Sequence, residues 1–319
     1  MKIIGTGSAT PKLSVTNEML STFLDTSDEW IRTRTGIQER RIISDENLKD
    51  LAIQAAKNAL GESGLDASEL DYIICSNVVN HYVTPALSCL IQGGLDATCP
   101  SVDLNAACTG FVYAMDMADA YIQSGKARNI LIVCAEEPTR MSSWKDRNTC
   151  VLFGDGAGAV VVTPGEDFRA SYITAFCKPE VLYYQRKLEN CPYVKYEQKD
   201  VPLYMNGKEV FKLAVNASLE GINAILKKAG ISPDDVNHYF LHQANMRILE
   251  TIRHQLHQPG EKFPHNIERY GNTSSASIPI LLDEMHKGRR LKYGDVVIFS
   301  AFGAGFTAGT MLMNWSIKD

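Results

Sequence analysis

The feature that most restricts the fold of this 319-residue chain is an internal repeat with a constant spacing. Residues 63–75 match residues 229–241, and their glycines, Gly64 and Gly230, are 166 positions apart. In both copies a helical pattern ends at the glycine and a short apolar strand follows. Repetition of such a unit predicts a duplicated architecture rather than one irregular domain.

The repeat continues through the next strand of each copy. Residues 130–135 match residues 296–301, again at a spacing of 166. Alternation of strands and helices favours an α/β fold with helices packed on sheets. We therefore expect two similar halves, residues 1–163 and 164–319, packed about a pseudo-twofold axis. Chance similarity of two βα units is the alternative.

Chemically useful side chains fall at matching junctions of the two copies. At a spacing of 164, Pro100 matches Pro264, each before a predicted strand, and Cys108 matches Asn272, each before an apolar helix. His242 comes directly after another predicted strand. Open α/β sheets bind ligands at the carboxyl ends of their strands, so we expect these three side chains in one crevice.

Other local predictions come from apolar spacing. A helix is predicted over residues 48–60, with Ser44 or Asp45 as its cap. Apolar runs predict further strands and one further helix: strands at 72–75, 130–134 and 157–162, and a helix at 111–122.

Cys108 is the strongest candidate for a nucleophile. Small neighbours leave room for a substrate, and a helix N-terminus stabilises the thiolate. The alternatives are a buried structural thiol, an ordinary core histidine at His242, and a cap or turn at Asn272. A Cys, His and Asn together serve covalent catalysis, but the same set also suits a cysteine protease. These residues alone therefore leave the reaction open.

Composition and charge exclude several classes of function. The net charge is −5, so there is no basic excess of the kind that nucleic-acid binders carry. Without an apolar run of about 18 residues or a signal peptide, we expect no membrane span and a cytoplasmic location. The eight cysteines form no Cys-x-x-Cys pair, so reduced thiols rather than a metal site are expected.

Two glycine-rich stretches are candidate binding loops. Residues 154–158 come before a strand, whereas a dinucleotide-binding loop follows a strand and opens a helix. Residues 301–306 follow a strand and suit a close approach of backbone N–H groups to a bound carbonyl oxygen. No nucleotide cofactor is predicted from either stretch.

Seven motifs in order resemble β-ketoacyl-[acyl-carrier-protein] synthase III, the initiating condensing enzyme of type II fatty-acid synthesis. The resemblance covers nearly the whole chain, and its segments are residues 5–8, 25–37, 107–111, 153–158, 242–245, 271–274 and 301–303. It implies an α/β, thiolase-like fold of five αβαβα layers made of two duplicated halves.

The resemblance also implies a reaction and its partners. The reaction is a decarboxylating Claisen condensation of an acyl-CoA primer with malonyl-acyl-carrier protein, giving a 3-oxoacyl-acyl-carrier protein. It needs no metal or cofactor, because acyl-CoA is a substrate, and it is expected in a homodimer. The implied residues are Cys108 as acyl-accepting nucleophile; His242 and Asn272 at the malonyl thioester carbonyl; the N–H groups of Cys108 and Ala304 as oxyanion hole; Trp30, Arg34 and Arg147 at coenzyme A; Phe302 at the decarboxylation site; and Lys212, Arg247 and Arg253 as the rim for the carrier protein.

Some positions depart from the family pattern. Ala308 stands where many members have tryptophan, and Thr84 stands where phenylalanine is frequent at the acyl pocket. The stretch 176–203, with Tyr183, Tyr184, Tyr193 and Tyr196, replaces a glycine-rich segment and is either a surface loop or part of the site. Primer length and branching stay open. A specialised paralogue acting as acyltransferase or thioesterase through the same cysteine, or a noncatalytic thiolase-fold subunit, remains the alternative.

Overall fold

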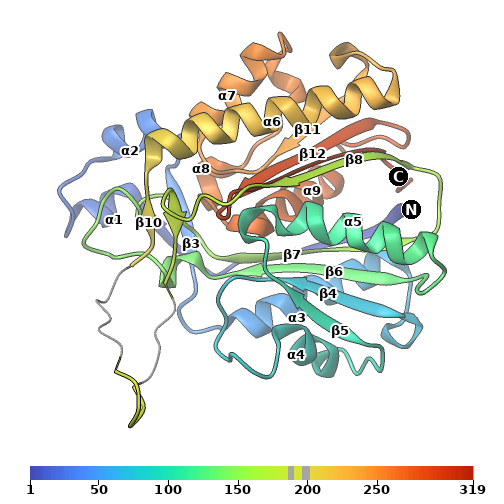
Figure 1. Cartoon of the computed structure of the whole chain (residues 1–319), viewed down its shortest axis with the longest axis horizontal. Helices are drawn as coiled ribbons and strands as arrows, with labels where there is room; N and C mark the ends of the chain where they lie inside the picture. Colours follow the sequence, from blue (N-terminus) through green and yellow to red (C-terminus); the bar gives the residue numbers. More distant parts are fainter. Residues whose placement is uncertain (186–189, 196–201, 319) are drawn as a thin grey trace.

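Two mixed β-sheets and three layers of helices form the structure, a computed structural model that describes residues 1–185, 190–195 and 202–318. Figure 1 shows α5 (Gly110–Gln123) and α9 (Ser277–Lys287) between the two sheets, where they contact strands of both. Helices α3 (Leu48–Ser63) and α4 (Leu87–Gly94) cover the outer face of one sheet, and α6 (Gly207–Ala229) covers the other. The layers therefore follow the order αβαβα.

The two sheets repeat one topology. The first has the order β1 (Lys2–Ala9), β7 (Gly156–Thr163), β6 (Ile130–Glu136), β4 (Tyr72–Ser76) and β5 (Ser101–Leu104). The second has the order β8 (Phe168–Ala175), β13 (Thr307–Asn314), β12 (Val296–Gly303) and β11 (His238–Leu241).

Strand directions match between the sheets. In each, the first three strands of the order are antiparallel, and the parallel pairing follows as β6 with β4 in one and β12 with β11 in the other. The predicted strands at 72–75, 130–134 and 157–162 correspond to β4, β6 and β7. The duplication expected from the repeat is thus present in the topology.

The repeat has a local physical cause at the ends of α3 and α6. Gly64 caps α3 with a φ of 71°, and Gly230 caps α6 with a φ of 67°. Both values lie in the left-handed region, which glycine adopts without strain.

At the other end of α3 the cap is Asn47, whose side chain accepts the Asp50 N–H at 3.0 Å. The predicted caps, Ser44 and Asp45, were therefore wrong by two or three residues.

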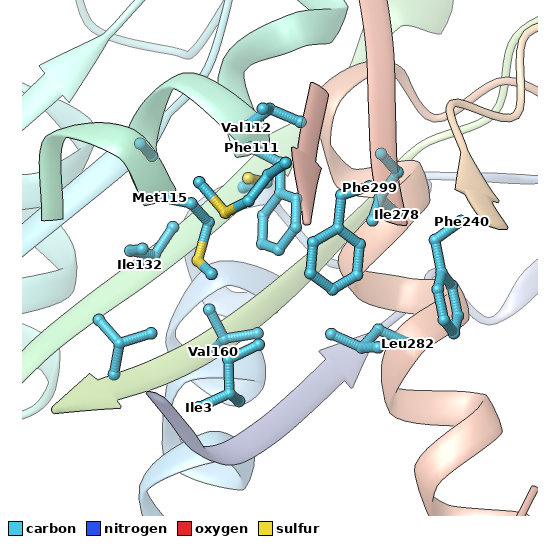
Figure 2. Packing of buried hydrophobic residues seen from close by; sticks show 14 of the residues in the cluster. Ile3, Phe111, Val112, Met115, Ile132, Val160, Phe240, Ile278, Leu282 and Phe299 are labelled. Carbon is cyan, nitrogen blue, oxygen red and sulfur yellow. The ribbon is translucent and has the colours of Figure 1, made fainter. Parts of the chain in front are cut away.

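The central core lies between the sheets, where α5 and α9 meet. Figure 2 shows Phe111 from α5 next to Phe299 from β12, and their rings make an edge contact with centroids 5.5 Å apart. Phe240 from β11 packs against the same Phe299 ring at 5.6 Å. Because this core joins elements of both copies, it fixes the two sheets relative to each other.

Among the described residues of the second copy, no strand corresponds to β5. The predicted strand after Pro264 is replaced by the short helix α8 (Ile267–Tyr270). Ile267 is fully buried, and the carbonyl of Glu268 accepts the Gln38 N–H at 2.9 Å. These contacts hold the segment against the neighbouring ribbon of β2 (Leu13–Thr16) and β3 (Glu39–Ile42), so the prediction of a strand was wrong.

The junctions before α5 and α9 align differently from the sequence prediction. The 3-10 turn η2 (Ala107–Thr109) leads into α5, and η6 (Ser274–Ala276) leads into α9. Each begins with a positive-φ residue, 47° at Ala107 and 52° at Ser274. The structural counterpart of Cys108 is therefore Ser275 rather than Asn272, which lies three residues earlier.

The remaining elements are short. They are α1 (Asn17–Ser21), α2 (Asp28–Thr35), α7 (Met246–Gln255), the ribbon of β2 (Leu13–Thr16) with β3 (Glu39–Ile42), the ribbon of β9 (Leu182–Tyr183) with β10 (Tyr204–Met205), and the 3-10 turns η1 (Ala67–Glu69), η3 (Pro138–Arg140), η4 (Pro233–Asp235) and η5 (Gly260–Lys262). Among the described residues, no helix combines the length and apolar character that a membrane crossing requires.

Candidate active site

A cavity of about 520 Å³ lies where the two copies meet, and it collects five of the predicted residues. Its lining contains Cys108, His242, Asn272, Phe302 and Ala304, together with many apolar side chains. The expected meeting of a thiol, an imidazole and a carboxamide in one crevice is therefore what the structure shows.

Cys108 sits in η2, directly before the first turn of α5. This places its sulfur near the unpaired N–H groups of a 14-residue helix, as the sequence predicted. Burial acts against the thiolate and raises the pKa of Cys108 to about 12, while the Ser274 hydroxyl, whose Oγ lies 3.4 Å from Sγ, lowers it. Burial thus favours the thiol form, and attack by that form on a substrate requires removal of its proton.

His242 is buried and neutral. It follows β11, and its backbone N–H donates to the Ser300 carbonyl of β12 at 2.8 Å. Burial lowers the pKa of His242 to about 3. Its Nδ1 lies 2.8 Å from Ser277 Oγ, which also accepts the Gln243 N–H at 3.3 Å. The Ser277 oxygen accepts the Gln243 N–H while the Ser277 hydroxyl hydrogen can be donated to Nδ1 of His242. In that arrangement the proton of the neutral imidazole is on Nε2, which is then a donor.

Asn272 has an amide with a defined orientation. Its Oδ1 accepts the Ser274 N–H at 2.9 Å, a bond that only the oxygen of the amide can make. The backbone of Asn272 is held on both sides, donating to the Leu152 carbonyl at 2.8 Å and accepting the Gly154 N–H at 3.1 Å. The Nδ2 group therefore remains available as a second neutral donor at the cavity.

The end of β12 packs closely against the turn η2 that holds Cys108. A Cβ on Gly303 would lie 2.7 Å from the Cys108 nitrogen, so only glycine allows this approach. Ala304 follows in the cavity lining, and among the described residues no hydrogen bond engages its N–H. Cys108 and Ala304 both line the same cavity, so their N–H groups are candidates for stabilising an oxyanion there.

Aromatic side chains close the cavity around His242. The Phe302 ring meets the imidazole edge-on, with centroids 5.3 Å apart, and stacks on Phe306. Tyr183 and Tyr184 from the β9 ribbon also line the cavity, and Tyr183 stacks on Tyr204 of β10. This part of the stretch 176–203 belongs to the site, whereas Tyr193 is exposed and Tyr196 lies outside the described residues.

Trp30, Arg34 and Arg147 form one cluster, in which Arg34 is exposed and the other two side chains are partly buried. The guanidinium carbons of Arg34 and Arg147 lie 4.6 and 5.0 Å from the centroid of the Trp30 ring. Arg147 also contacts the carboxylate of Asp25 at 3.2 Å. Trp30 packs against a hydrophobic core that contains Met141 and Leu203, and these two residues also line the cavity. Trp30 and the two arginines therefore lie outside the cavity wall.

Of the three basic residues predicted to contact the carrier protein, two are exposed. Arg247 and Lys212 are exposed, and Arg247 lines a second hollow that shares Met205 and Asn245 with the main cavity. Arg253 instead pairs with Glu250 at 2.6 Å and donates to the Gln258 carbonyl at 3.2 Å. Lys208, which the sequence did not single out, also lines the second hollow.

Other candidate binding sites receive no support from the geometry. In the part of the chain that the structure describes, no cluster of three or more His, Cys, Asp or Glu residues could hold a metal. The stretch 154–158 packs tightly, because a Cβ on Gly154 would lie 2.1 Å from the Tyr270 carbonyl and one on Gly158 would lie 2.8 Å from the Ile280 nitrogen. Its glycines therefore serve packing.

Sequence reasoning missed three residues of the site. Ser274 and Ser277 lie in the motif that also holds Asn272, but their pattern of contacts depends on the fold. Glu136 is fully buried behind Ser274, which donates to it at 3.2 Å. Its one signal in the sequence is an acidic residue at the end of the apolar run 130–135.

Comparison with known proteins places the whole chain in one family. Residues 102–178 match the family described as 3-oxoacyl-[acyl-carrier-protein (ACP)] synthase III, and residues 226–315 match its C-terminal region. The chain is 45% identical to beta-ketoacyl-[acyl-carrier-protein] synthase III of Aquifex aeolicus, with 98% of this chain and 99% of that protein covered. It is 43% identical to the Clostridium novyi protein of the same name, with 99% of each covered.

Solved structures agree with these sequence matches. The Aquifex aeolicus 3-oxoacyl-[acyl-carrier-protein] synthase III matches with a TM-score of 0.90 over 98% of this chain and 99% of that one, at 44% identity. The Thermus thermophilus synthase III matches with a TM-score of 0.93 over 99% of both, at 36% identity. The fold is thus the thiolase-like one that the resemblance implied, and the chain belongs to the β-ketoacyl-[acyl-carrier-protein] synthase III family.

Proposed function

We propose that the protein condenses an acyl-CoA primer with malonyl-acyl-carrier protein and so initiates fatty-acid synthesis. The observation that carries the proposal is the shared cavity, in which a thiol, a neutral imidazole and an oriented carboxamide line one apolar space. Family membership over nearly the full chain supports the same reaction. Acyl-CoA acts as a substrate, and the proposed chemistry uses no cofactor.

In the first half-reaction, Cys108 accepts the acyl group. Its sulfur attacks the thioester carbonyl, and the N–H groups of Cys108 and Ala304 stabilise the oxyanion of the tetrahedral intermediate. Coenzyme A then leaves. Trp30 is the proposed stacking surface for adenine, with Arg34 and Arg147 at its phosphates, and the guanidinium groups move aside to admit the base.

In the second half-reaction, His242 and Asn272 hold the malonyl thioester. Loss of carbon dioxide leaves an enolate, whose oxygen needs donors that are neutral and already in place. The low pKa of His242 keeps its imidazole neutral, and the Ser274 N–H orients the amide of Asn272. The carbanion then attacks acyl-Cys108, with Phe302 shielding the site from water.

Lys212 and Arg247 are the proposed contacts for the acidic carrier protein, whereas Arg253 is already paired with Glu250. We further propose that residues 1–163 and 164–319 are the two halves of each chain, and that two such chains form a homodimer in the cytoplasm. All eight cysteines are free thiols, which fits a reducing compartment.

The variant Asn272→Ala tests the division of labour between the two half-reactions. We expect it to take up the acyl group at the rate of the wild type and to condense roughly 10²–10³ times more slowly, because one enolate donor is gone. Intact mass measures acylation, and labelled carbon dioxide released from malonyl-carrier protein measures decarboxylation. Cys108→Ala is the control that takes up no acyl group. Normal condensation by Asn272→Ala would contradict the assigned role.

A further inference from the structure

The thiol of Cys108 has a path for its proton that leads away from the substrate cavity. Ser274 Oγ lies 3.4 Å from Cys108 Sγ on one side and 3.2 Å from Glu136 Oε1 on the other. The Glu136 side chain comes from the end of β6 and is fully buried behind this serine. A sulfur, a hydroxyl and a carboxylate therefore form one continuous chain from the reacting atom into the protein.

We propose that Ser274 relays the proton of Cys108 to Glu136 when the thiol attacks an acyl thioester. The inference rests on the proposed function, since it concerns the acylation step of that reaction. Ser274 touches the reacting sulfur directly, whereas Glu136 acts only through Ser274 and does not line the cavity.

The relay would supply the proton acceptor that attack by the Cys108 thiol requires. Burial favours the thiol form of Cys108, so a group within hydrogen-bond reach must take the proton during attack. His242 is a poor acceptor, because burial lowers its pKa to about 3. Among the described residues, Ser274 is the hydroxyl group that contacts Cys108 Sγ, and a hydroxyl can accept one proton while it donates another.

The surroundings of Glu136 suit a proton acceptor that works near neutral pH. Burial raises its pKa to about 7, and hydrogen bonds from Val78, Ser274 and Ser275 limit that rise. Oε1 accepts the Ser275 hydroxyl at 2.5 Å as well as Ser274, and Oε2 accepts the Val78 N–H at 3.1 Å. A carboxylate with a pKa raised toward neutrality can take up and release a proton near pH 7.

The other titratable groups around Glu136 are thiols. Cys108 faces it from η2, Cys134 from β6 and Cys75 from β4, and each has a pKa raised by burial. The nearby carboxylate of Asp103 on β5 is occupied by the side chain of Asn77 at 2.9 Å and acts on Cys75. Within the described part of the chain, no lysine or arginine pairs with Glu136. The carboxylate is thus the one group here that changes charge near pH 7.

The proton balance of acylation closes without another reactant. As Sγ bonds to the carbonyl carbon, its proton moves to Ser274 Oγ and the serine proton moves to the Glu136 carboxylate. When the tetrahedral intermediate collapses, the carbon–sulfur bond to coenzyme A breaks. The departing sulfur takes up one proton and Glu136 gives one up through Ser274, so the carboxylate is restored.

If the serines only support Glu136, loss of either hydroxyl should slow acylation equally. Ser274 and Ser275 are a matched pair that distinguishes this structural role from a proton relay. Ser274 and Ser275 lie in the same turn and donate to the same oxygen, but of the two only Ser274 contacts Cys108. Loss of either hydroxyl removes one support of Glu136. Loss of Ser274 alone interrupts the path from the sulfur.

The experiment measures the single-turnover rate of Cys108 acylation by acetyl-CoA between pH 5 and 9, followed by intact mass. For the wild type we expect a rate that rises with a midpoint near pH 7. Glu136→Gln and Ser274→Ala should lose this midpoint and react roughly 10² times more slowly at pH 7, as expected for loss of a general base. Ser275→Ala should react within about threefold of the wild type and keep a midpoint, shifted upward because one donor to Glu136 is gone.

Two results would overturn the relay: a wild-type pH profile in Glu136→Gln, or equal slowing in Ser274→Ala and Ser275→Ala. If Glu136→Gln does not fold, the pair of serine variants still decides. A parallel assay follows alkylation of Cys108 by iodoacetamide at the peptide level, with the same expected midpoints. Because alkylation needs no acyl-CoA, it tests the relay even if the wild type takes up no acyl group, a result that would refute the proposed function instead.

Discussion

The contact between Gly303 and the nucleophile makes the variant Gly303→Ala a sensitive probe of the site. An added Cβ would lie 2.7 Å from the Cys108 nitrogen, 3.1 Å from Ala107 Cβ and 3.2 Å from the Thr109 nitrogen. Ordinary contacts between carbon atoms are about 3.5–4.0 Å, so η2 and the end of β12 must separate by close to 1 Å. All three contacts are with η2, and two of them are with backbone nitrogens, so rotation of a side chain cannot relieve them.

Two consequences are expected from this separation. Overpacking should lower the free energy of unfolding by about 1–3 kcal/mol. Displacement of Cys108 from Ala304 by nearly 1 Å should slow acylation by about 10²-fold, because oxyanion stabilisation depends on the donor distance. The KM for acyl-CoA should change little, since the Trp30 cluster lies outside the cavity wall.

Gly61→Ala is the matched control for this variant. Gly61 lies in α3, and no atom lies within 4 Å of the position that an added Cβ would take. Alanine should stabilise this helix by about 0.5–1 kcal/mol and leave acylation unchanged. Urea unfolding and single-turnover acylation by intact mass measure both quantities. If Gly303→Ala acylates within threefold of the wild type, the close approach of Gly303 to Cys108 does not hold the oxyanion donors in place.

Three further predictions concern coenzyme A, the carrier protein and stability. Trp30→Ala should raise the KM for acyl-CoA roughly tenfold and leave the saturated acylation rate unchanged, because a base stacked on an aromatic ring is worth about 1–3 kcal/mol. In steady-state kinetics, Lys212→Glu with Arg247→Glu should raise the KM for malonyl-carrier protein, less so at high salt. Arg253→Ala, which loses only a paired cation, should not raise it. Burial raises the pKa of Asp155 to about 6, so between about pH 4 and 6 the folded state binds its proton more tightly than the unfolded state does. The free energy of unfolding should therefore fall as pH rises through this window, by at most roughly 1 kcal/mol per unit, and urea unfolding of Asp155→Asn should show a smaller fall.

The duplicated fold could be predicted because its signals are local. Gly64 and Gly230 end their helices in the left-handed conformation, and apolar strands follow at the same distance in both copies. The absent counterpart of β5 could not be predicted. Ile267 is buried in a cluster with residues far away in the chain, and that packing outweighs the similarity around Pro264.

The polar residues that line the cavity could be predicted from the sequence, but the residues that support them could not. Cys108, His242 and Asn272 each carry a recognisable residue type at a strand or helix end, and they do line one cavity. Their supports were not predictable, because Ser277 and Glu136 act through contacts between segments remote in sequence. The protonation of Cys108 was also missed, since burial depends on the packing of the whole cavity.

The alignment of the two junctions shows the limit of reading a repeat from sequence. A spacing of 164 matched Cys108 with Asn272, whereas the turns η2 and η6 match it with Ser275. The error came from small differences in loop length between the copies. It did not affect the site, because Asn272 reaches the cavity from a position just before the turn.

The most direct test of the account is a chase experiment on the acylated protein. The wild type is first exposed to acyl-CoA and then to malonyl-carrier protein, while intact mass and released carbon dioxide are followed together. We expect one acyl group on Cys108 that disappears with release of one equivalent of carbon dioxide and appearance of a 3-oxoacyl product. An acyl group that persists in Cys108→Ala, or one lost as free acid without carbon dioxide, would contradict it.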